Sequence, residues 1–385
     1  MALKRLNVGM IGCGFMGRAH STAWDAVRKF FKLPVDPVMH TVTGTPGEDV
    51  QGFAKQWGWN KASIDWESVV ADPEIDVVDV VTPNNMHMPV ALKAAAAGKH
   101  VCCEKPIACT VAEASEMATA VQRAGVKSCV WFCYRHVPAV ALAHQLVRAG
   151  KIGRIFHASL FYLQDWADPT VPLAWRFQKE TAGSGAHGDL NAHIVDMCRF
   201  VTGEEITVNS AMAKTIIKQR KLQIGAVAGG ISEGLQASEE MGDVTVDDSL
   251  AFLAELSGGA MAVFQAARQA TGNKNRNGFE ICGEKGALRF DFEDMNKLWF
   301  YDATAPEAVQ GWTNILVTNG AGHPYVGAYW PGGHLVGYQH GFSNQAYSFI
   351  RILNGEEPVV PVPNFADAVK TQMVLEDAYM KSGRG

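Results

Sequence analysis

Two short segments of the sequence carry side chains that could move a proton and stabilise charge on an oxygen atom. One is Glu104-Lys105-Pro106, directly after a short apolar run. In the other, Asp189 and His193 are four residues apart, so they would share one face of a helix. An imidazole has an unperturbed pKa of about 6.5, close to what a general base needs, and a lysine amine can polarise a hydroxyl. A lone histidine on a helix is more often structural, although Asp196, three residues further on, could also touch it.

A cofactor site is indicated near the start of the chain. The apolar run Leu6 to Ile11 is typical of a buried strand, and Gly12-Cys13-Gly14-Phe15-Met16-Gly17 follows it before a helical stretch. In this context the first glycine allows a tight turn, the second lets the backbone approach a pyrophosphate, and the third lets the helix pack on the strand. Free N–H groups at the helix start would hold the phosphates. A plain glycine-rich turn is the alternative interpretation.

The residues after the second predicted strand leave the choice of dinucleotide open. Thr43-Gly44-Thr45-Pro46 lacks the acid that usually binds the 2′-hydroxyl of the NAD ribose. It also lacks an arginine for the 2′-phosphate of NADP. The residues themselves therefore favour neither cofactor.

Strands and helices alternate through the first third of the chain, and this places the Glu104-Lys105-Pro106 segment. Strands are predicted at 38–43, 77–81, 100–103 and 126–133, and helices from 50, over 89–97 and from 111. Thr110 and Glu113 form a capping box for the last of these helices. Repeated strand–helix–strand units are typical of a doubly wound parallel sheet, whose ligands bind outside the carboxyl ends of the strands. We therefore predict an α/β Rossmann domain over 1–133, with Lys105 at its ligand-binding edge.

The second half of the chain changes character. After a helix over 137–149, long strand-like segments are predicted at 155–164, 206–215, 249–269 and 279–290. The last two turn at Ser257 to Gly259 and at Gly283 to Gly286, which is typical of antiparallel hairpins. Lys218 to Asp243 is polar and glycine-rich and is predicted to be a long surface loop, and a last helix is predicted over 364–379. We predict an α+β domain over 134–363 with a large, mostly antiparallel open sheet.

Composition excludes several classes of protein. Hydrophobic residues make up 48% and charged residues 19%, as in a folded globular protein. The net charge is -5 with no basic run, so neither a nucleic acid nor a membrane is expected as a partner. The first strand begins too early to leave room for a signal peptide. Eight cysteines without paired C-x-x-C spacing, and histidines without H-E-x-x-H, indicate free thiols in the cytoplasm and no metal site.

In this order and spacing, the glycine motif, Glu104-Lys105-Pro106 and Gly188-Asp189-x-x-x-His193 resemble the Gfo/Idh/MocA oxidoreductases. The resemblance covers essentially the whole chain and includes Gly150-Lys151-Ile152-Gly153, which is similar to the family's usual lead into the second domain. Three segments are similar to the levoglucosan dehydrogenase-like branch: Tyr162 to Trp166, Trp175 to Phe177 and Ala182 to Ala186. That branch oxidises a ring hydroxyl of a sugar or anhydrosugar, often at C3.

The resemblance implies the cofactor and the catalytic residues. Lys105, Asp189 and His193 would form the catalytic set, and we assign the proton to His193, with Lys105 as the alternative base. The implied cofactor is NAD, with NADP not excluded. Its contacts are expected from Gly12, Gly14, Phe15, Met16, Gly17, Thr43, Pro83, Asn84, His87, Glu104 and Lys105. The family's C-terminal helix folds back onto the first domain, which corresponds to residues 364–385 here.

The substrate is expected to bind between the domains. Aromatic side chains suit the apolar faces of a pyranose, and arginine donates hydrogen bonds to hydroxyls. The residues expected to contact it are Tyr134, Arg135, Gln164, Trp166, Arg176, His187 and Asn191. Core or interdomain packing is the alternative for Trp166, Trp175 and Arg176. His187 and Asn191 stand where relatives usually carry an apolar residue and a glycine.

Three functions are consistent with these residues. The first is a dehydrogenase for a ring hydroxyl of a sugar, anhydrosugar, glycoside or inositol. The second is a glycoside hydrolase or lyase that retains NAD and oxidises C3 only transiently. The third is a non-catalytic dinucleotide sensor, against which the presence of Lys105 and His193 argues. Release of one NADH per substrate separates the first function from the second.

The second domain also predicts self-association. Successive residues of its predicted strands, which point to opposite faces of the sheet, are all apolar, as in Leu250 to Ala254. A sheet covered by helices on one face would therefore leave an apolar face open. An open apolar face of that size usually binds a partner. We expect a homodimer or homotetramer.

Overall fold

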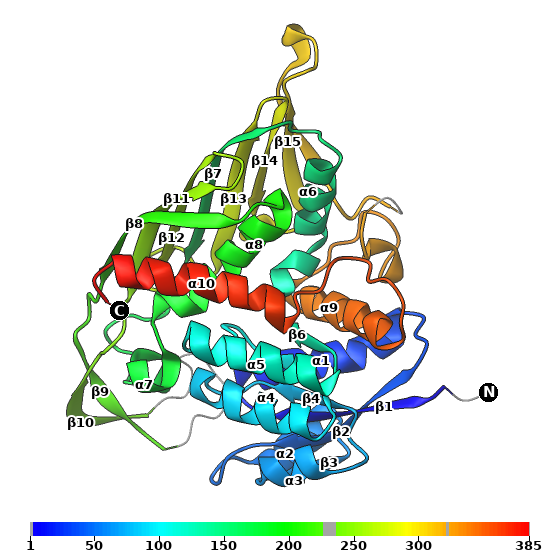
Figure 1. Ribbon diagram of the computed structural model, residues 1–385, viewed down its shortest axis with the longest axis vertical. Coiled ribbons are helices and arrows are strands. Elements are labelled where there is room, and N and C mark those ends of the chain that lie inside the picture. Colours follow the sequence, from blue (N-terminus) through cyan, green and yellow to red (C-terminus); the bar gives the residue numbers. More distant parts are fainter. Residues whose placement is uncertain (1–2, 226–235, 321–322, 385) are drawn as a thin grey trace.

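The computed structural model describes residues 3–225, 236–320 and 323–384. Its first part is a parallel sheet in the order β3-β2-β1-β4-β5-β6, drawn in blue and cyan in Figure 1. Strands β1 to β3 are added in one direction and β4 to β6 in the other, and this reversal of strand order creates a crevice at the carboxyl ends of β1 and β4. The strands are β1 (Arg5–Ile11), β2 (Asp36–Thr43), β3 (Lys61–Ser63), β4 (Val77–Val80), β5 (His100–Cys103) and β6 (Ser128–Val130). The predicted Rossmann sheet is confirmed.

Helices connect these strands, as the alternating pattern predicts. They are α1 (Phe15–Phe30), α2 (Val50–Trp57), α3 (Trp66–Ala71), α4 (His87–Ala96) and α5 (Val111–Ala124). The capping box is present, because the side chain of Thr110 accepts a hydrogen bond from the backbone N–H of Glu113 at the start of α5. The pattern does not predict β3 and α3, because three and six residues are too few for a periodic signal.

The second part is a larger sheet in the order β16-β15-β14-β13-β7-β12-β11-β8. Every neighbouring pair is antiparallel except β7 and β12. The strands are β7 (Ile155–Leu163), β8 (Ile206–Lys214), β11 (Ser249–Leu256), β12 (Met261–Ala267), β13 (Arg276–Gly283), β14 (Gly286–Asp291), β15 (Lys297–Asp302) and β16 (Trp312–Leu316). Both predicted hairpins form, and β15 and β16 extend the sheet beyond the predicted strands.

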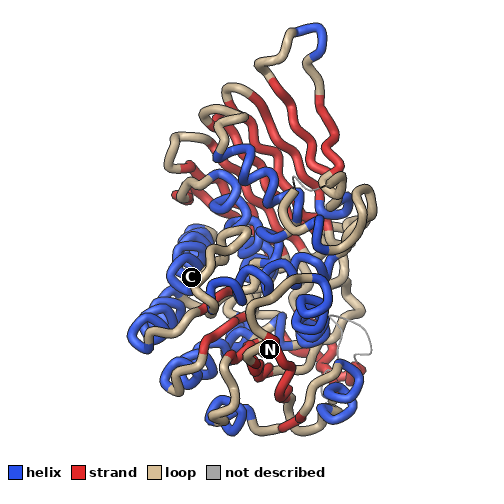
Figure 2. The backbone as a smooth tube through the Cα atoms, turned by 90° about the vertical axis from the view of Figure 1, so that its right-hand side faces the viewer, coloured by secondary structure: helices blue, strands red, loops and turns tan. Residues whose placement is uncertain are grey.

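Helices cover one face of this sheet and leave the other open, as Figure 2 shows. The covering helices are α6 (Pro138–Arg148), α8 (Ala192–Thr202) and α10 (Phe365–Lys381). Along β11, Leu250 and Phe252 point to the helices and are buried, whereas Leu253 on the opposite face is 47% exposed. Met212 on β8 and Met261 on β12 are exposed as well. The open face therefore carries large apolar side chains.

The chain returns to the first domain with two helices. The expected one is α10, which packs against α5 of the first domain and also against β8 and α8 of the second. The other is α9 (Tyr338–Leu353), which packs against α1 and was not expected from the sequence. Just before α10, the backbone N–H of Val130 on β6 donates to the carbonyl oxygen of Pro363. The domain boundaries at 133 and 363 stay a prediction.

One predicted loop is wrong. Lys218 to Asp243 contains a two-stranded ribbon, β9 (Gln219–Ile224) and β10 (Gln236–Asp243), and residues 226–235 of the predicted loop lie outside the described part. The ribbon has almost no buried apolar side chains, so it shows no alternating pattern in the sequence. Within the described residues, no helix is long and apolar enough to cross a membrane.

Candidate active site

A cavity of about 980 Å³ lies where the carboxyl ends of the Rossmann strands face the second sheet. Both domains contribute to its wall. The predicted site residues that line it are Gly12, Gly14, Phe15, Met16, Thr43, Pro83, Asn84, Glu104, Lys105, Tyr134, Gln164, Trp166, Arg176, Asp189 and His193. The two chemically active segments of the sequence therefore meet in one cavity, although 84 positions separate Lys105 from Asp189.

The glycine motif shapes one end of this cavity. Gly12 has a φ of +114°, and a Cβ there would lie 2.6 Å from the carbonyl oxygen of Val81, so only glycine fits. A Cβ on Gly17 would lie 3.1 Å from the carbonyl oxygen of Gly12, which reflects close packing of helix on strand. A Cβ on Gly14 would meet nothing within 4 Å, and no side chain caps the helix start there. Open space in front of the free N–H groups of α1 fits a pyrophosphate.

At the other end, the carboxylate of Asp189 is held between two cations. Lys105 Nζ lies 2.6 Å from Asp189 Oδ1 and donates also to the backbone carbonyl oxygen of Asp189, at 3.0 Å. Arg268 donates to Asp189 Oδ2 at 2.9 Å. Burial by itself raises the pKa of Asp189, but Lys105, Arg268 and Arg176 outweigh it and hold that pKa well below its ordinary value. Asp189 is therefore ionised and fixes the amine of Lys105 in the cavity wall.

His193 lies beside this ion cluster as a neutral ring. Burial first, and the charge of Lys105 second, lower the pKa of His193 well below 6.5. The ring packs against Tyr134, with centroids 4.6 Å apart. Its Nδ1 is buried and has no hydrogen-bond partner among the described residues, which leaves Nε2 as the nitrogen available to a ligand. Asp189 and Asp196 do not orient the ring, because their oxygens bond to other cations.

A hydrogen-bonded chain of side chains forms the wall on the side of the second sheet. The hydroxyls of Tyr134 and Tyr162 are 2.7 Å apart, and Tyr162 donates to Asn275 Oδ1. Gln164 donates to the same Asn275 oxygen, and Trp166 Nε1 donates to Gln164 Oε1 at 2.8 Å. This chain fixes the rotamers of the aromatic rings, so the wall is organised before a ligand arrives.

A loop before the Asp189 segment supplies a further aromatic–cation pair. The guanidinium of Arg176 lies over the ring of Trp175, 4.4 Å from its centroid, and both residues line the cavity. Burial lowers the pKa of Arg176, and the charge of Asp189 opposes that effect. The buried side chain of Arg220 on β9 supports this loop by donating to the carbonyl oxygens of Ala167, Asp168 and Val171.

A π-helical turn, His187–Asn191, carries Asp189 into the cavity. The sequence predicts one regular helix from Gly188 onwards, but α8 begins only at Ala192. Asp247 holds the turn from outside, since its two carboxylate oxygens accept from the backbone N–H groups of Gly185 and His187, each at 2.8 Å. A Cβ on Gly185 would lie 1.7 Å from the carbonyl oxygen of Asp247, so the approach requires glycine. Turns of this kind are frequent at functional sites.

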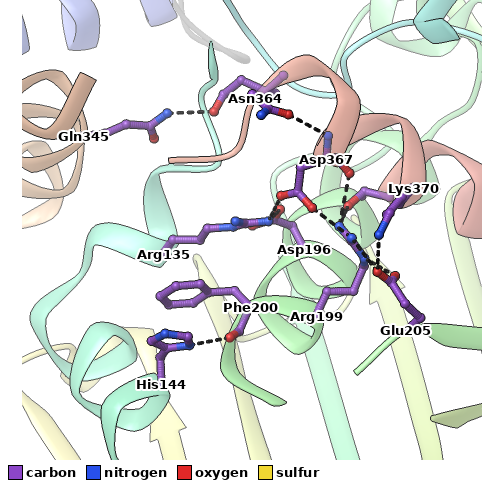
Figure 3. Close-up of polar contacts among 12 residues, drawn as sticks. Arg135, His144, Asp196, Arg199, Phe200, Glu205, Gln345, Asn364, Asp367 and Lys370 are labelled. Atoms are coloured by element: carbon purple, nitrogen blue, oxygen red, sulfur yellow. Dashed lines mark hydrogen bonds and ion pairs between the residues drawn. The ribbon is translucent and has the colours of Figure 1, made fainter. Parts of the chain in front are cut away.

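Arg135 does not reach the cavity, which corrects its predicted role as a substrate contact. Its guanidinium bonds to Asp196 at 2.7 Å and to Asp367 on α10 at 2.7 Å, and Figure 3 shows these bonds. Arg199 joins the same network through Asp367 and Glu205. Nε and Nη2 of Arg135 are both bonded in this ion cluster, so the side chain holds α10 to the molecule.

His187, Asn191 and His87 are also predicted site residues that do not line the cavity. His187 Nε2 donates to the carbonyl oxygen of Leu375 on α10, and its Nδ1 accepts from Asn191 Nδ2 at 2.9 Å. The nitrogens of His87 lie 3.0 and 3.1 Å from the carbonyl oxygens of Pro106 and Thr82. Their ring nitrogens and the Asn191 amide nitrogen face protein atoms and not the cavity, so the three side chains support the site from behind. Gly17 likewise acts through packing.

Several further residues of the cavity wall are not among the predicted contacts. They are Tyr162, Ser184, Arg268, Asn275 and Tyr338, whereas Trp175, for which packing was the alternative, lines the cavity. Arg268 is the most informative, because it bonds Asp189 directly and is only 1% exposed. Arg268 could have been recognised in the sequence as a charged residue directly after an apolar strand, β12. That end of the strand faces the first domain.

Comparison with known proteins agrees with this architecture. Residues 6–132 match the family model for the oxidoreductase family with an NAD-binding Rossmann fold, and residues 140–289 match the GFO/IDH/MocA C-terminal domain. The chain is 39% identical to levoglucosan dehydrogenase of Pseudarthrobacter phenanthrenivorans over 384 residues, which cover 99% of this chain and 96% of that protein.

Two solved structures are similar along their whole length. One is an oxidoreductase domain protein from Kribbella flavida, with a TM-score of 0.91, 46% identity and coverage of 99% of this chain and 98% of that chain. The other is levoglucosan dehydrogenase in complex with NADH and levoglucosan, with a TM-score of 0.90, 36% identity and the same coverage. The chain therefore belongs to the Gfo/Idh/MocA family and is an NAD-dependent oxidoreductase.

Proposed function

We propose that this protein oxidises a secondary ring hydroxyl of a sugar, anhydrosugar or glycoside, at C3, with NAD as the hydride acceptor. One observation carries the proposal: a single cavity joins the glycine motif, the Lys105–Asp189 pair and an aromatic wall. The full-length similarity to levoglucosan dehydrogenase supports an anhydrosugar as the first substrate to test.

The cavity fits both reactants. The open space at Gly14 and the free N–H groups of α1 would hold the pyrophosphate, and Glu104 and Asn84 lie further along the wall for the nicotinamide half. When bound, NAD supplies the acceptor for the hydride that leaves the carbinol carbon. Trp166 and Trp175 present aromatic faces that suit the apolar faces of a pyranose ring.

The chain's own residues would manage the proton of the substrate hydroxyl. Lys105, held by Asp189, donates a hydrogen bond to the hydroxyl oxygen and stabilises the negative charge that develops there. The lowered pKa of His193 keeps the ring neutral at neutral pH, so the lone pair of Nε2 is free to receive the hydroxyl proton. Arg268 keeps the Asp189 carboxylate in place while the amine of Lys105 engages the substrate.

A substrate screen tests the proposal. Purified protein is mixed with NAD and, separately, with levoglucosan, free hexoses, glycosides and inositols, and NADH is followed by absorbance. We expect one NADH per molecule of anhydrosugar or sugar oxidised. Release of an aglycone without net NADH would instead identify an NAD-retaining hydrolase, and no turnover of any compound would contradict both.

We also infer a homodimer or homotetramer formed through the open face of the second sheet. Leu253, Met212 and Met261 support this, since each is close to half exposed or more on that face. A cytoplasmic location is supported by the cysteines, all eight of which are free thiols.

A further inference from the structure

The end of β2 is where a dinucleotide-binding domain usually places the acid that recognises the ribose 2′-hydroxyl. This chain has Thr43-Gly44-Thr45-Pro46 there, without an acid or a base. The structure shows a carboxylate nevertheless, because the chain turns back after Pro46 and brings Glu48 into the cavity wall beside Thr43.

Two hydrogen bonds from Thr45 fix this carboxylate. Glu48 Oε2 accepts from the backbone N–H of Thr45 and from its hydroxyl, each at 2.6 Å. The same oxygen lies 3.1 Å from the position of a Cβ built on Gly44, and Cys13 Sγ of the glycine motif lies 2.7 Å from that position. The carboxylate thus stands between the end of β2 and the glycine turn, which is where the adenosine ribose of a dinucleotide lies in this fold.

The carboxylate keeps capacity for another donor. Both Thr45 bonds use Oε2, so Oε1 is left for a hydroxyl. The thiol of Cys13 lies nearby and is a weak donor. Burial first, and the charge and hydrogen bond of Glu48 after it, raise the pKa of that thiol to about 12, so no thiolate competes with the carboxylate.

The described wall residues at this end of the cavity include no cation that would neutralise a phosphate. Among the described wall residues between Thr43 and Trp66, none is a lysine or arginine. The basic side chains of the wall belong to the substrate half, where Lys105 and Arg268 already bond Asp189. A 2′-phosphate would therefore meet an anion without a compensating cation.

We propose that Glu48 is the residue that makes this enzyme select NAD over NADP. Its carboxylate accepts a hydrogen bond from the ribose 2′-hydroxyl and repels a 2′-phosphate. Glu48 replaces in space the acid that is missing from the strand end, although it is five residues beyond Thr43.

The test measures dinucleotide affinity without substrate. Dissociation constants for NADH and NADPH are determined by calorimetry for the wild-type protein and for Glu48→Gln, which keeps the size and removes the charge. We expect NADH to bind wild type more tightly, and the ratio of the two constants to shift toward NADPH by about 10-fold or more in Glu48→Gln. Glu116→Gln, at an exposed position on α5, removes the same charge far from the cavity and should leave the ratio unchanged.

A second variant separates the effect of the Thr45 hydrogen bond that positions Glu48 from the effect of the Glu48 charge. Thr45→Val removes the hydroxyl that positions Glu48 but keeps the carboxylate, so NADH should bind several-fold more weakly while NADPH stays excluded. A folded Glu48→Gln protein with the wild-type ratio, or wild type that binds both dinucleotides equally, would overturn the proposal. Because the readout is affinity alone, failure of the proposed sugar oxidation would leave this result standing.

Discussion

Asp189 shows how one residue connects the two halves of the site. Its carboxylate bonds Lys105 from the first domain on one oxygen and Arg268 from the second sheet on the other. A carboxylate between two cations costs little to keep ionised, and it restricts the long side chain of Lys105 to one orientation. His193 has no orienting acid among the described residues, so of these two side chains Lys105 has the more firmly fixed position.

Substitution of these two residues should separate their roles. Lys105→Met removes the charge and keeps the length, and we expect kcat to fall by about 100-fold or more. His193→Ala should reduce kcat to a similar extent, because the proton acceptor is lost. Steady-state kinetics over a range of pH and NADH affinity check both variants, and NADH affinity should be retained. If His193→Ala keeps most of the activity and the pH profile, Lys105 is the base.

His20 on α1 predicts a pH-dependent stability. Its ring lies 3.0 Å from Asp79 and 2.9 Å from Glu104, and it is fully buried. Burial alone lowers the pKa of His20, but the two carboxylates outweigh it and raise that pKa to about 9. Since the folded protein then binds a proton more tightly than the unfolded chain, this stabilisation is complete below pH 6.5 and is lost as pH rises toward about 9.

Urea unfolding at pH values between about 6 and about 9.5 measures this effect. The free energy of unfolding should fall by up to about 1.4 kcal/mol per pH unit within the window. His20→Gln has no titrating group and should be less stable at pH 6.5 with a flatter dependence. Equal slopes for the two proteins would show that His20 is neutral in the folded state.

At the scale of elements, a side chain added at Gly14, in the turn between β1 and α1, should leave the fold intact and block the binding of NADH. A Cβ on Gly14 meets nothing within 4 Å, so Gly14→Leu should fold with a melting temperature near that of wild type. The leucine would occupy the space in front of the α1 N–H groups, and we expect the Kd for NADH to rise by at least about 100-fold. Gly311→Leu places the same residue at another open glycine and serves as control. Unchanged NADH affinity in folded Gly14→Leu would contradict the assignment.

Elements with a repeating pattern could be predicted from the sequence, and elements without one could not. The Rossmann strands are buried on both sides and form continuous apolar runs, and the hairpins of β11–β12 and β13–β14 turn at glycines. The ribbon β9–β10 is mostly exposed, so its residues show no alternation. The π-helical turn depends on Asp247, which is 58 residues beyond Asp189 and acts on the backbone.

The site was predictable to the extent that a local motif marked it. Lys105, Asp189 and the glycines belong to such motifs, and all of these except Gly17 line the cavity. Arg268 and Glu48 reach it through strand order and a chain reversal, which single-sequence patterns do not contain. His187 and Arg135 show the opposite error: polar residues close to a motif were expected to face the ligand, whereas α10 uses their hydrogen bonds.

At the scale of the whole molecule, the open sheet face predicts assembly. Leu253 lies on β11, next to the edge strand, and it is flanked by Ser210 on β8 and Val263 on β12. A charge there would be buried unpaired in an interface, so Leu253→Arg should convert the assembly to monomers at micromolar concentration by light scattering. Val309→Arg, at a 71% exposed position between β15 and β16, is the matched control. A wild-type monomer under the same conditions would contradict the prediction.

Helix α10 belongs to both domains at once, because it packs against α5 on one side and against β8 and α8 on the other. The Asp367 carboxylate on this helix bonds Arg199 on α8 and Arg135 in the turn that follows β6, so ion pairs also hold the helix in place. Loss of α10 would expose apolar side chains of both domains. The two domains should therefore melt in a single cooperative transition. Dinucleotide binding to the first domain then raises the melting temperature of the second by mass action.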